Sequence, residues 1–241
     1  MTRLAGRHVL VTGASSGIGQ ATARRLAAEG ARVGVLARRG PELERLAEEC
    51  DGVAVVCDVV DAEATRAAVD RVAEAIGALD GVVNAAGVVR PARVADADPG
   101  DVRRMLEVNV LGLVHVTQAA IPHLRARGRG DVVNLSSMSG RRLQTPEMGI
   151  YGATKAAVHT LSEGLRRELR EDRVRVTTLA PGLVDTPIFE GLEDPVSQRL
   201  RDAAPRAGLT AAEVAGSIAD VLAAPEHLVH VEVALLSLDQ D

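Results

Sequence analysis

The only tyrosine and the only lysine of this 241-residue chain stand four positions apart, at Tyr151 and Lys155. On a helix this spacing puts both side chains on one face. A free phenol has a pKa near ~10, but an ammonium about 4 Å away, at an effective dielectric near 20, attracts a phenolate by about 4 kcal/mol. That attraction is worth roughly three pKa units before desolvation opposes it. The pair therefore predicts a general acid/base whose pKa is shifted toward neutral pH.

All other basic side chains apart from the histidines are arginines, 27 in number. An arginine at position 155 would keep the charge, but its wide planar group would place that charge differently. A lysine retained in so arginine-rich a chain indicates that a compact ammonium is needed beside Tyr151.

A glycine-rich turn follows the first expected strand and precedes a helix rich in Ala, Arg and Leu. Glycines let the backbone turn tightly and approach a pyrophosphate, whose charge is stabilised by the free N–H groups of a helix N-terminus. A flexible loop is the alternative, but the strand before and the helix after favour phosphate binding. The turn reads Thr12-Gly13-Ala14-Ser15-Ser16-Gly17-Ile18-Gly19.

Short runs rich in Val and Leu alternate with longer amphipathic stretches along the chain. The strands are expected at 8–11, 32–36, 53–57, 81–83, 131–135, 174–179 and 228–236, and the helices are expected to begin near Gly17, Pro41, Asp61, Asp101, Ile150 and Thr210. This alternation predicts an α/β fold, a Rossmann-type doubly wound sheet of seven parallel strands with helices on both faces.

One domain is expected over residues 1–241, with a cofactor half of about 1–130 and a catalytic or substrate half of about 131–241. The segment 183–205 carries several prolines and mixed charges without a clean period, and we interpret it as an excursion or lid.

Composition excludes several classes of function. The chain is 46% hydrophobic and carries a net charge of -5 at pH 7, so no nucleic-acid partner is expected, because phosphate binding needs a cationic face. No apolar run approaches the ~18 residues that span a bilayer, and the run 8–11 is too short for a secretory core, which predicts a cytoplasmic protein without a membrane partner. Cys50 and Cys57 are expected to serve packing, and no histidine spacing indicates a metal site.

The order of these motifs resembles the short-chain dehydrogenase/reductase family in its compact single-domain form, over the chain to about Ala224. The resemblance implies an NADP-preferring oxidoreductase that transfers hydride between a nicotinamide and a small or medium carbonyl or secondary alcohol, with Tyr151 as general acid/base. The motifs that carry it are Thr12 to Gly19, Asp58, Asn84-Ala85-Ala86-Gly87, Asn109, Ser136-Ser137, the Tyr151 and Lys155 pair, and Pro181-Gly182 with Thr186.

The family pattern implies four catalytic residues, Asn109, Ser137, Tyr151 and Lys155. Ser137 would orient the substrate oxygen beside Tyr151, although its spacing of 14 is one longer than in many relatives, which leaves Ser136 or Ser139 as alternatives. Asn109 would hold a water that relays protons from Lys155, or its amide would satisfy a helix kink. Asn134 is expected to be structural.

The implied cofactor contacts follow the ends of the strands. Asp58 and Val59 would contact the adenine, and Val184 and Thr186 the nicotinamide amide. Structural alternatives are a strand-end polar residue for Asp58, a turn former for Asn84 and a cap for Thr186. The full set is Gly13, Ser15, Ser16, Gly17, Ile18, Gly19, Arg38, Arg39, Asp58, Val59, Asn84, Ala85, Ala86, Gly87, Tyr151, Lys155, Pro181, Gly182, Val184 and Thr186.

The choice of cofactor can be argued from charge. An acid after the second strand would bind a ribose diol and repel a 2′-phosphate, whereas an arginine accommodates that phosphate. Here Arg38 and Arg39 follow the strand, which favours NADP(H) over NAD(H), with Arg38 as first contact and Arg39 in support. The alternative is that both arginines are solvated, and Ser16 occupies a position where NADP-preferring relatives often carry a basic residue.

The sequence says less about the substrate. Arg90, Arg93, Arg141 and Arg142 could favour an acidic substrate, but surface placement is the stronger interpretation in a chain with 27 arginines. The expected substrate contacts are Ser137, Met138, Gln144, Tyr151 and Phe189, with Leu143, Met148, Ile188 and Leu192 as further wall residues.

The expected partners are a small carbonyl or alcohol substrate and further copies of the chain, in a homodimer or homotetramer. Two other functions stay open at this point. One is a non-catalytic NADP(H)-binding sensor or scaffold, and the other is a cofactor-assisted epimerase or isomerase.

Overall fold

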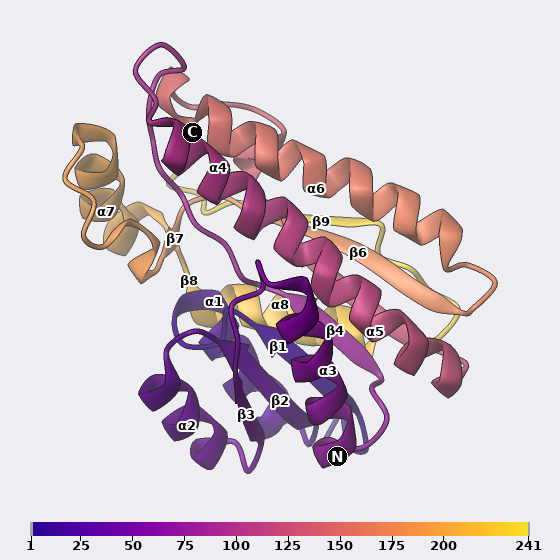
Figure 1. Ribbon diagram of the computed structural model, residues 1–241. Helices are drawn as coiled ribbons and strands as arrows, with labels where there is room; N and C mark the ends of the chain where they lie inside the picture. Colours follow the sequence, from indigo (N-terminus) through magenta and orange to yellow (C-terminus); the bar gives the residue numbers. More distant parts are fainter. Residues whose placement is uncertain (1, 241) are drawn as a thin grey trace.

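The Val- and Leu-rich runs form one parallel sheet in the computed structural model, which describes residues 2–240 (Figure 1). The strand order in these residues is β3-β2-β1-β4-β5-β6-β9, and each neighbouring pair is parallel. The order reverses between β1 and β4, and ligands of such sheets bind outside the carboxyl ends of the strands at this point. The expected seven-stranded doubly wound fold is confirmed. The strands are β1 (His8–Thr12), β2 (Arg32–Ala37), β3 (Val53–Val56), β4 (Gly81–Asn84), β5 (Gly130–Leu135), β6 (Val174–Pro181) and β9 (Glu232–Leu235).

Helices cover both faces of the sheet, and each face buries its own apolar cluster. The helices α1 (Gly17–Ala28), α2 (Gly40–Glu49) and α8 (Ala211–Ala223) lie on one face, and α3 (Ala62–Ile76), α5 (Leu113–Arg127) and α6 (Gly149–Glu168) lie on the other. Capping explains several starts. The Asp61 side chain accepts from the Ala64 amide at the start of α3, and Thr210 and Glu213 form a capping box on α8.

One long helical run lies on the second face. It joins α4 (Pro99–Leu106), a π-helical turn η1 (Glu107–Gly112) and α5, so it starts at the Asp98 cap rather than near Asp101. By length and composition the run Pro99–Arg127 could cross a membrane, because it contains an 18-residue window with a mean hydropathy of 1.2, so the expectation of no such apolar run is wrong. Half of the residues in this window are buried, and α5 packs against α3. The run is therefore a core helix of the fold.

One expectation near the C-terminus needs correction, the extent of the last strand. The last strand covers only β9, because Leu228, Val229 and Val231 before it are exposed and the Leu228 carbonyl accepts from the Arg175 side chain. The segment 183–205 is not irregular.

That segment and the residues after it hold β7 (Val184–Asp185), a 3-10 turn η4 (Pro187–Phe189), helix α7 (Pro195–Ala207) and β8 (Leu209–Thr210), which pairs with β7. Pro195 stands at the start of α7, and Asp194 caps it. The helix buries only Val196, Ser197 and Ala204, which is too little to give an apolar period. In Figure 1, α7 stands out from the rest of the fold beside β7.

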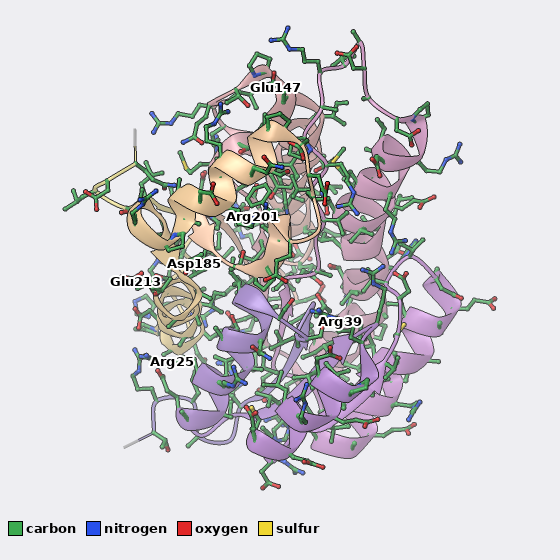
Figure 2. All side chains as sticks on the ribbon, turned by 90° about the vertical axis from the view of Figure 1, so that its left-hand side faces the viewer. Arg25, Arg39, Glu147, Asp185, Arg201 and Glu213 are labelled. Carbon is green, nitrogen blue, oxygen red and sulfur yellow. The ribbon has the colours of Figure 1, made fainter. Side chains whose placement is uncertain are left out.

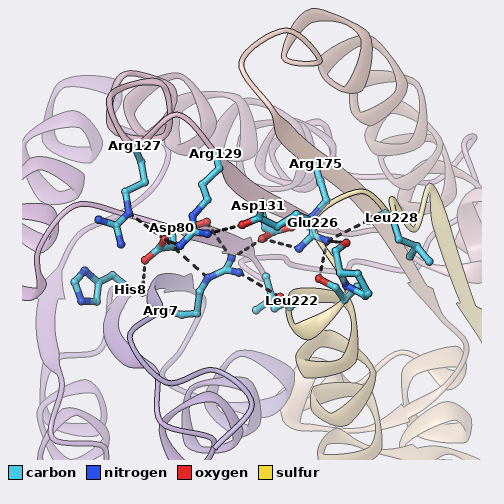
Figure 3. A network of polar contacts seen from close by, with 12 residues as sticks. Arg7, His8, Asp80, Arg127, Arg129, Asp131, Arg175, Leu222, Glu226 and Leu228 are labelled. Carbon is cyan, nitrogen blue, oxygen red and sulfur yellow. Dashed lines mark hydrogen bonds and ion pairs between the residues drawn. The ribbon is translucent and has the colours of Figure 1, made fainter.

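Two buried carboxylates hold the amino-terminal edge of the sheet together (Figure 3). Asp80 precedes β4, is 1% exposed and accepts from Arg127 Nε at 3.2 Å. Asp131 on β5 accepts from Arg175 Nε at 2.7 Å and from Arg7 Nη2 at 2.5 Å. These pairs join β1, β4, β5 and β6 at the edge opposite the glycine-rich turn.

We expect Asp80→Asn to lower the free energy of unfolding by about 2 kcal/mol, because a neutral amide replaces the buried carboxylate that accepts charge-assisted hydrogen bonds from Arg127 and its neighbours. Urea denaturation at pH 7 measures this loss. Glu49→Gln is the matched control, since the Arg24–Glu49 pair is half-exposed and should contribute less than about 1 kcal/mol. Equal, small losses in both variants would contradict a supporting role for the buried network.

Candidate active site

The loop after β1 and the turn after β4 are locked together at the carboxyl edge of the sheet. The Thr12 hydroxyl oxygen accepts from the amides of Ala85 at 3.1 Å and Ala86 at 3.2 Å. Gly13 has φ +64, and a Cβ there would lie 2.7 Å from the Ala86 nitrogen. Position 13 therefore needs glycine because another stretch of protein backbone passes close to it, in addition to the turn itself.

The start of α1 is left open toward this loop. A Cβ at Gly19 would lie 2.5 Å from the Gly13 carbonyl oxygen, so the loop curls directly onto the helix. Ser16 at the N-cap makes no side-chain capping bond, whereas α3, α4, α7 and α8 are all capped by side chains. The first N–H groups of α1 are thus available to an anion, and the loop fits the pyrophosphate of a dinucleotide.

A groove of about 210 Å³ runs along this loop. Most of the predicted cofactor contacts line it: Gly13, Ser15, Ser16, Gly17, Ile18, Gly19, Arg38, Arg39, Asp58, Val59, Ala85, Ala86 and Gly87. Further residues lining it were not predicted as cofactor contacts: Leu36, Ala37, Cys57, Val88, Arg104, Val108, Pro187 and Ile188.

Asn84 does not line the groove, and its place among the cofactor contacts stays a prediction. Its amide nitrogen donates to Asn134 Oδ1 at 2.8 Å and to Thr117 Oγ1 at 3.1 Å, inside the fold. Asn134 in turn donates to the Ser162 hydroxyl, in agreement with the structural role expected for it. Asn84 therefore supports the turn from behind, because its side chain is bonded within the sheet–helix core.

Thr186 also lies outside the lining of the groove and of the cavity beside it. Its hydroxyl donates weakly to the Val184 carbonyl at 3.4 Å. Its methyl group faces Gly17, where a Cβ would lie 3.3 Å away. Thr186 thus contacts the glycine loop, while Pro181, Gly182 and Val184 line the neighbouring cavity.

The far end of the groove is cationic. Asp58 Oδ2 lies 2.9 Å from Arg104 Nη2 and 4.0 Å from Arg38 Nη1. Burial alone would raise the pKa of Asp58, but the bonds from Arg104 and the Val60 amide, with the Arg38 charge, hold it below its usual value. Arg39 Nε donates to the Ser15 hydroxyl at 3.1 Å.

The guanidinium groups of Arg38 and Arg104 therefore flank the Asp58 carboxylate, and Arg39 bonds to Ser15 in the same groove. No sequence signal identifies Arg104, because its helix position does not distinguish it from the other arginines. Its place at the groove follows from the packing of the long helix Pro99–Arg127 against the sheet.

A smaller cavity of about 130 Å³ adjoins the groove and holds Tyr151 and Lys155 of α6. Lys155 Nζ lies 5.8 Å from the centre of the Tyr151 ring and donates to the Leu135 carbonyl at 2.8 Å. Both side chains are buried, at 7% and 5% exposure. The structure thus brings the lone tyrosine and the lone lysine together on one helix face, at the carboxyl end of β5.

Ser137 is the hydroxyl that meets the phenol, through a side-chain hydrogen bond with Tyr151. Ser136 is used elsewhere, because its hydroxyl donates to the Lys155 carbonyl at 2.8 Å. The long spacing to Tyr151 is taken up by two 3-10 turns, η2 (Met138–Gly140) and η3 (Pro146–Met148). A Cβ at Gly140 would lie 2.8 Å from the Lys155 carbonyl carbon, so the first of these turns packs directly on α6.

Asn109 lies in the π-helical turn, and its side chain bonds to protein groups. Its amide nitrogen donates to the Val88 carbonyl at 2.9 Å and to Thr154 Oγ1 at 3.0 Å, and its oxygen accepts from the Val88 amide at 2.8 Å. The two side-chain donors are therefore occupied, and the side chain ties the turn after β4 to α6. These partners lie outside the helical run Pro99–Arg127, so the amide joins separate segments and does not bond to the backbone of its own π-helical turn.

Burial dominates the protonation of the pair, against the expectation that Lys155 would bring Tyr151 near neutral pH. It raises the pKa of Tyr151 to about 12, although the Ser137 hydrogen bond acts in the opposite direction. It also lowers the pKa of Lys155 to about 8. At neutral pH the phenol is thus protonated and can donate a proton, because the low-dielectric site disfavours its anion.

The cavity has an apolar wall. Val89, Met105, Met148, Tyr151 and Phe189 form a buried cluster beside it. The five predicted substrate contacts, Ser137, Met138, Gln144, Tyr151 and Phe189, all line the cavity, together with the further candidates Met148 and Ile188. Leu143 does not line it and is 52% exposed, and Leu192 packs against the buried cluster instead.

Helix α7 fronts this side of the molecule. Arg201 Nη1 donates to the Phe189 carbonyl at 3.2 Å and the Leu192 carbonyl at 3.4 Å, which ties α7 to the cavity wall. In Figure 2, which faces this helix, Arg201 lies between Glu147 above and Arg39 below. Within residues 2–240 no group of three or more His, Cys, Asp or Glu side chains could hold a metal ion.

The buried lysine predicts an unusual dependence of stability on pH. Below pH 8 Lys155 is charged in both the folded and the unfolded chain, and its burial cost is fully present. Between pH 8 and its ordinary 10.5 the unfolded chain binds more protons, so the free energy of unfolding rises with pH. We expect Lys155→Met to have a higher free energy of unfolding than wild type at pH 7.5. This difference between the two proteins should shrink by on the order of 3 kcal/mol by pH 10.

Urea denaturation at the two pH values measures that change. Arg167→Met, an exposed substitution on the same helix, is the control and should show a difference from wild type that does not vary with pH. A Lys155→Met difference that also stays constant would mean that the lysine keeps its ordinary pKa.

The chain is similar in sequence and in fold to known proteins. The short chain dehydrogenase profile matches residues 7–196. An uncharacterized oxidoreductase of Staphylococcus epidermidis is 34% identical over 240 residues, which cover 98% of this chain and 99% of that protein.

Two solved structures share the fold closely. The closed form of serine dehydrogenase complexed with NADP+ has a TM-score of 0.90 and 29% identity, over 97% of this chain and 96% of that chain. A 3-ketoacyl-(acyl-carrier-protein) reductase from Brucella melitensis complexed with NADH has a TM-score of 0.86 and 29% identity, over 96% and 97%.

Proposed function

The chain belongs to the short chain dehydrogenase family and is an oxidoreductase, and we propose that it interconverts a small or medium carbonyl compound and its secondary alcohol with NADP(H). The observation that carries this proposal is the buried, protonated Tyr151, hydrogen-bonded to Ser137 in a cavity that adjoins the dinucleotide groove. Asn109, Ser137, Tyr151 and Lys155 are the proposed catalytic set, with Asn109 in a positioning role.

The proposed chemistry assigns each side chain a task. When bound, the reduced nicotinamide supplies a hydride to the carbonyl carbon and leaves oxidised. Ser137 donates a hydrogen bond to the carbonyl oxygen and fixes its approach to Tyr151. The Tyr151 phenol gives its proton to that oxygen, which completes the alcohol, and solvent later returns a proton to the phenolate. The Lys155 ammonium, held by the Leu135 carbonyl, stabilises the phenolate that forms.

The preference for NADP(H) rests on charge. Arg38, Arg39 and Arg104 outnumber Asp58 at the end of the groove where the adenosine of a dinucleotide would lie, and such an end attracts a 2′-phosphate. The serine dehydrogenase neighbour is complexed with NADP+, whereas the 3-ketoacyl reductase neighbour is complexed with NADH. The local arginines therefore support NADP(H) more directly than the neighbours do.

The remaining proposals concern the domain organisation, the location and the assembly of the enzyme. We propose one domain for the whole chain, because a single sheet takes strands from both halves. A cytoplasmic location and a homodimer or homotetramer are proposed as well.

We expect Tyr151→Phe to lower kcat for carbonyl reduction on the order of 10²- to 10⁴-fold, because the proton donor is removed while the ring stays. Initial rates of NADPH oxidation with a panel of aldehydes and ketones measure the loss. The Kd of NADPH, followed by nicotinamide fluorescence in this Trp-free chain, should change little. Turnover within a few-fold of wild type would exclude Tyr151 as the donor. Product formation without net NADPH consumption would instead identify an isomerase.

We expect Arg38→Gln to weaken NADPH binding on the order of tenfold, the loss of about one charge-assisted hydrogen bond to phosphate. NADH binding should change by less than about twofold, since NADH lacks the 2′-phosphate. Arg32→Gln is the matched control, because Arg32 is exposed at the opposite end of the same strand β2. Equal weakening of both cofactors by Arg38→Gln would contradict the assigned role.

A further inference from the structure

Four arginines border the sequence that forms the substrate cavity, and three of them are bound to acids. Arg93 Nε lies 3.1 Å from Glu147 Oε1, and Arg90 Nε lies 3.4 Å from Asp101 Oδ1. The other two, Arg141 and Arg142, are adjacent in the loop between η2 and η3.

Arg141 pairs with Glu232 through two of its nitrogens, away from the cavity. Arg142 lines the cavity itself. Within residues 2–240 the Arg142 side chain makes no ion pair and no hydrogen bond. Of the four arginines, Arg142 is therefore the one that lines the cavity without being paired to an acid.

The backbone fixes the position of this guanidinium relative to Tyr151. The Arg142 amide donates to the Met138 carbonyl at 2.9 Å, one residue after Ser137. The same turn packs on α6 through Gly140, whose Cβ position is 2.8 Å from the Lys155 backbone. Arg142 thus belongs to the same short structural unit as the hydroxyl that would hold the carbonyl oxygen.

The charge balance of the cavity favours an anion. Its lining contains two cations, Arg142 and Lys155, and no aspartate or glutamate, although the chain as a whole carries a net charge of -5. The other lining residues are uncharged, and Met148, Ile188 and Phe189 form an apolar part of the wall. Arg142 is exposed, so water solvates its donors in the free protein, and a carboxylate that enters the cavity would replace this water with charge-assisted hydrogen bonds.

We propose that Arg142 binds the carboxylate of the substrate, so that the enzyme acts on short oxo acids and the corresponding hydroxy acids. This rests on the proposed function. The planar guanidinium matches a carboxylate through two parallel hydrogen bonds. The cavity of about 130 Å³ is well below the roughly 300 Å³ of the smaller pockets for drug-sized ligands, which limits the acid to a short chain. A single arginine balances one negative charge, which favours a carboxylate over a doubly charged phosphate ester.

The test compares a charged ligand with its neutral counterpart. Binding of butanoate and of butanamide to the protein with NADP+ present is measured by thermal melting in wild type, Arg142→Gln and Arg142→Lys. We expect butanoate to raise Tm and butanamide to do so much less. The difference should vanish in Arg142→Gln and return in part in Arg142→Lys. Arg141→Gln is the matched control and should keep the wild-type difference.

Kinetics supply the second measurement, with 3-oxobutanoate and its methyl ester as the reducible pair. We expect kcat/KM to favour the acid in wild type and the ratio of acid to ester to fall at least about tenfold in Arg142→Gln, mainly through KM. Equal ratios in the two proteins, or butanoate binding that does not depend on Arg142, would overturn the inference. Arg142-dependent binding without reduction of either probe would leave the carboxylate site standing and count against the proposed reaction.

Discussion

The burial of one ammonium group, that of Lys155, organises the whole carboxyl edge of the sheet. Charge taken out of water must be compensated locally, and the Leu135 carbonyl at the end of β5 accepts from it. The lysine's own carbonyl accepts from Ser136, and the following turn packs on its backbone through Gly140. Even so, burial lowers the pKa of this lysine to about 8, so the arrangement costs stability at neutral pH. The ion pairs of Asp80 and Asp131 lie at the opposite edge of the same sheet, where they can offset that cost without entering the site.

Buried amides and hydroxyls tie the carboxyl end of the sheet to the helices α5 and α6. The three asparagines of the sequence all take part. Asn84 and Asn134 bond to each other across β4 and β5, and Asn109 joins the turn after β4 to α6 through Thr154. Buried polar groups of this kind stabilise a fold only when they find partners, and then they permit few other arrangements. The asparagines therefore fix the turn after β4 and helix α6 relative to the sheet, and Thr12 ties the glycine loop to the same turn.

Local pattern was enough to predict the sheet, the glycine loop and the meeting of Tyr151 with Lys155, because each depends on short spacing or on apolar runs. The failures share a different origin. Helix α7 buries too little to show a period, and the run 228–236 is apolar yet mostly exposed before β9. The contacts of Arg104 and of the Asn84 side chain were not predicted, because their partners come from distant segments: Asp58 for the first, Thr117 and Asn134 for the second. Tertiary packing decides which residues meet across the sheet, and the spacing of residues along the sequence does not reveal it.

The protonation of Tyr151 and Lys155 was also not predictable from their spacing, and it shows what the site gains from burial. Pairwise attraction alone predicts a tyrosine titrating near neutral pH, but desolvation acts on both groups and keeps the phenol neutral, with a pKa of about 12. Before proton transfer, Lys155 faces a neutral ring 5.8 Å from its nitrogen and gains little from it. After the phenol has given up its proton, the same ammonium faces an anion in a medium of low dielectric, where attraction is several times stronger than in water. The interaction is therefore concentrated in the state that follows proton transfer, and an interaction of that kind lowers a reaction barrier rather than merely tightening binding.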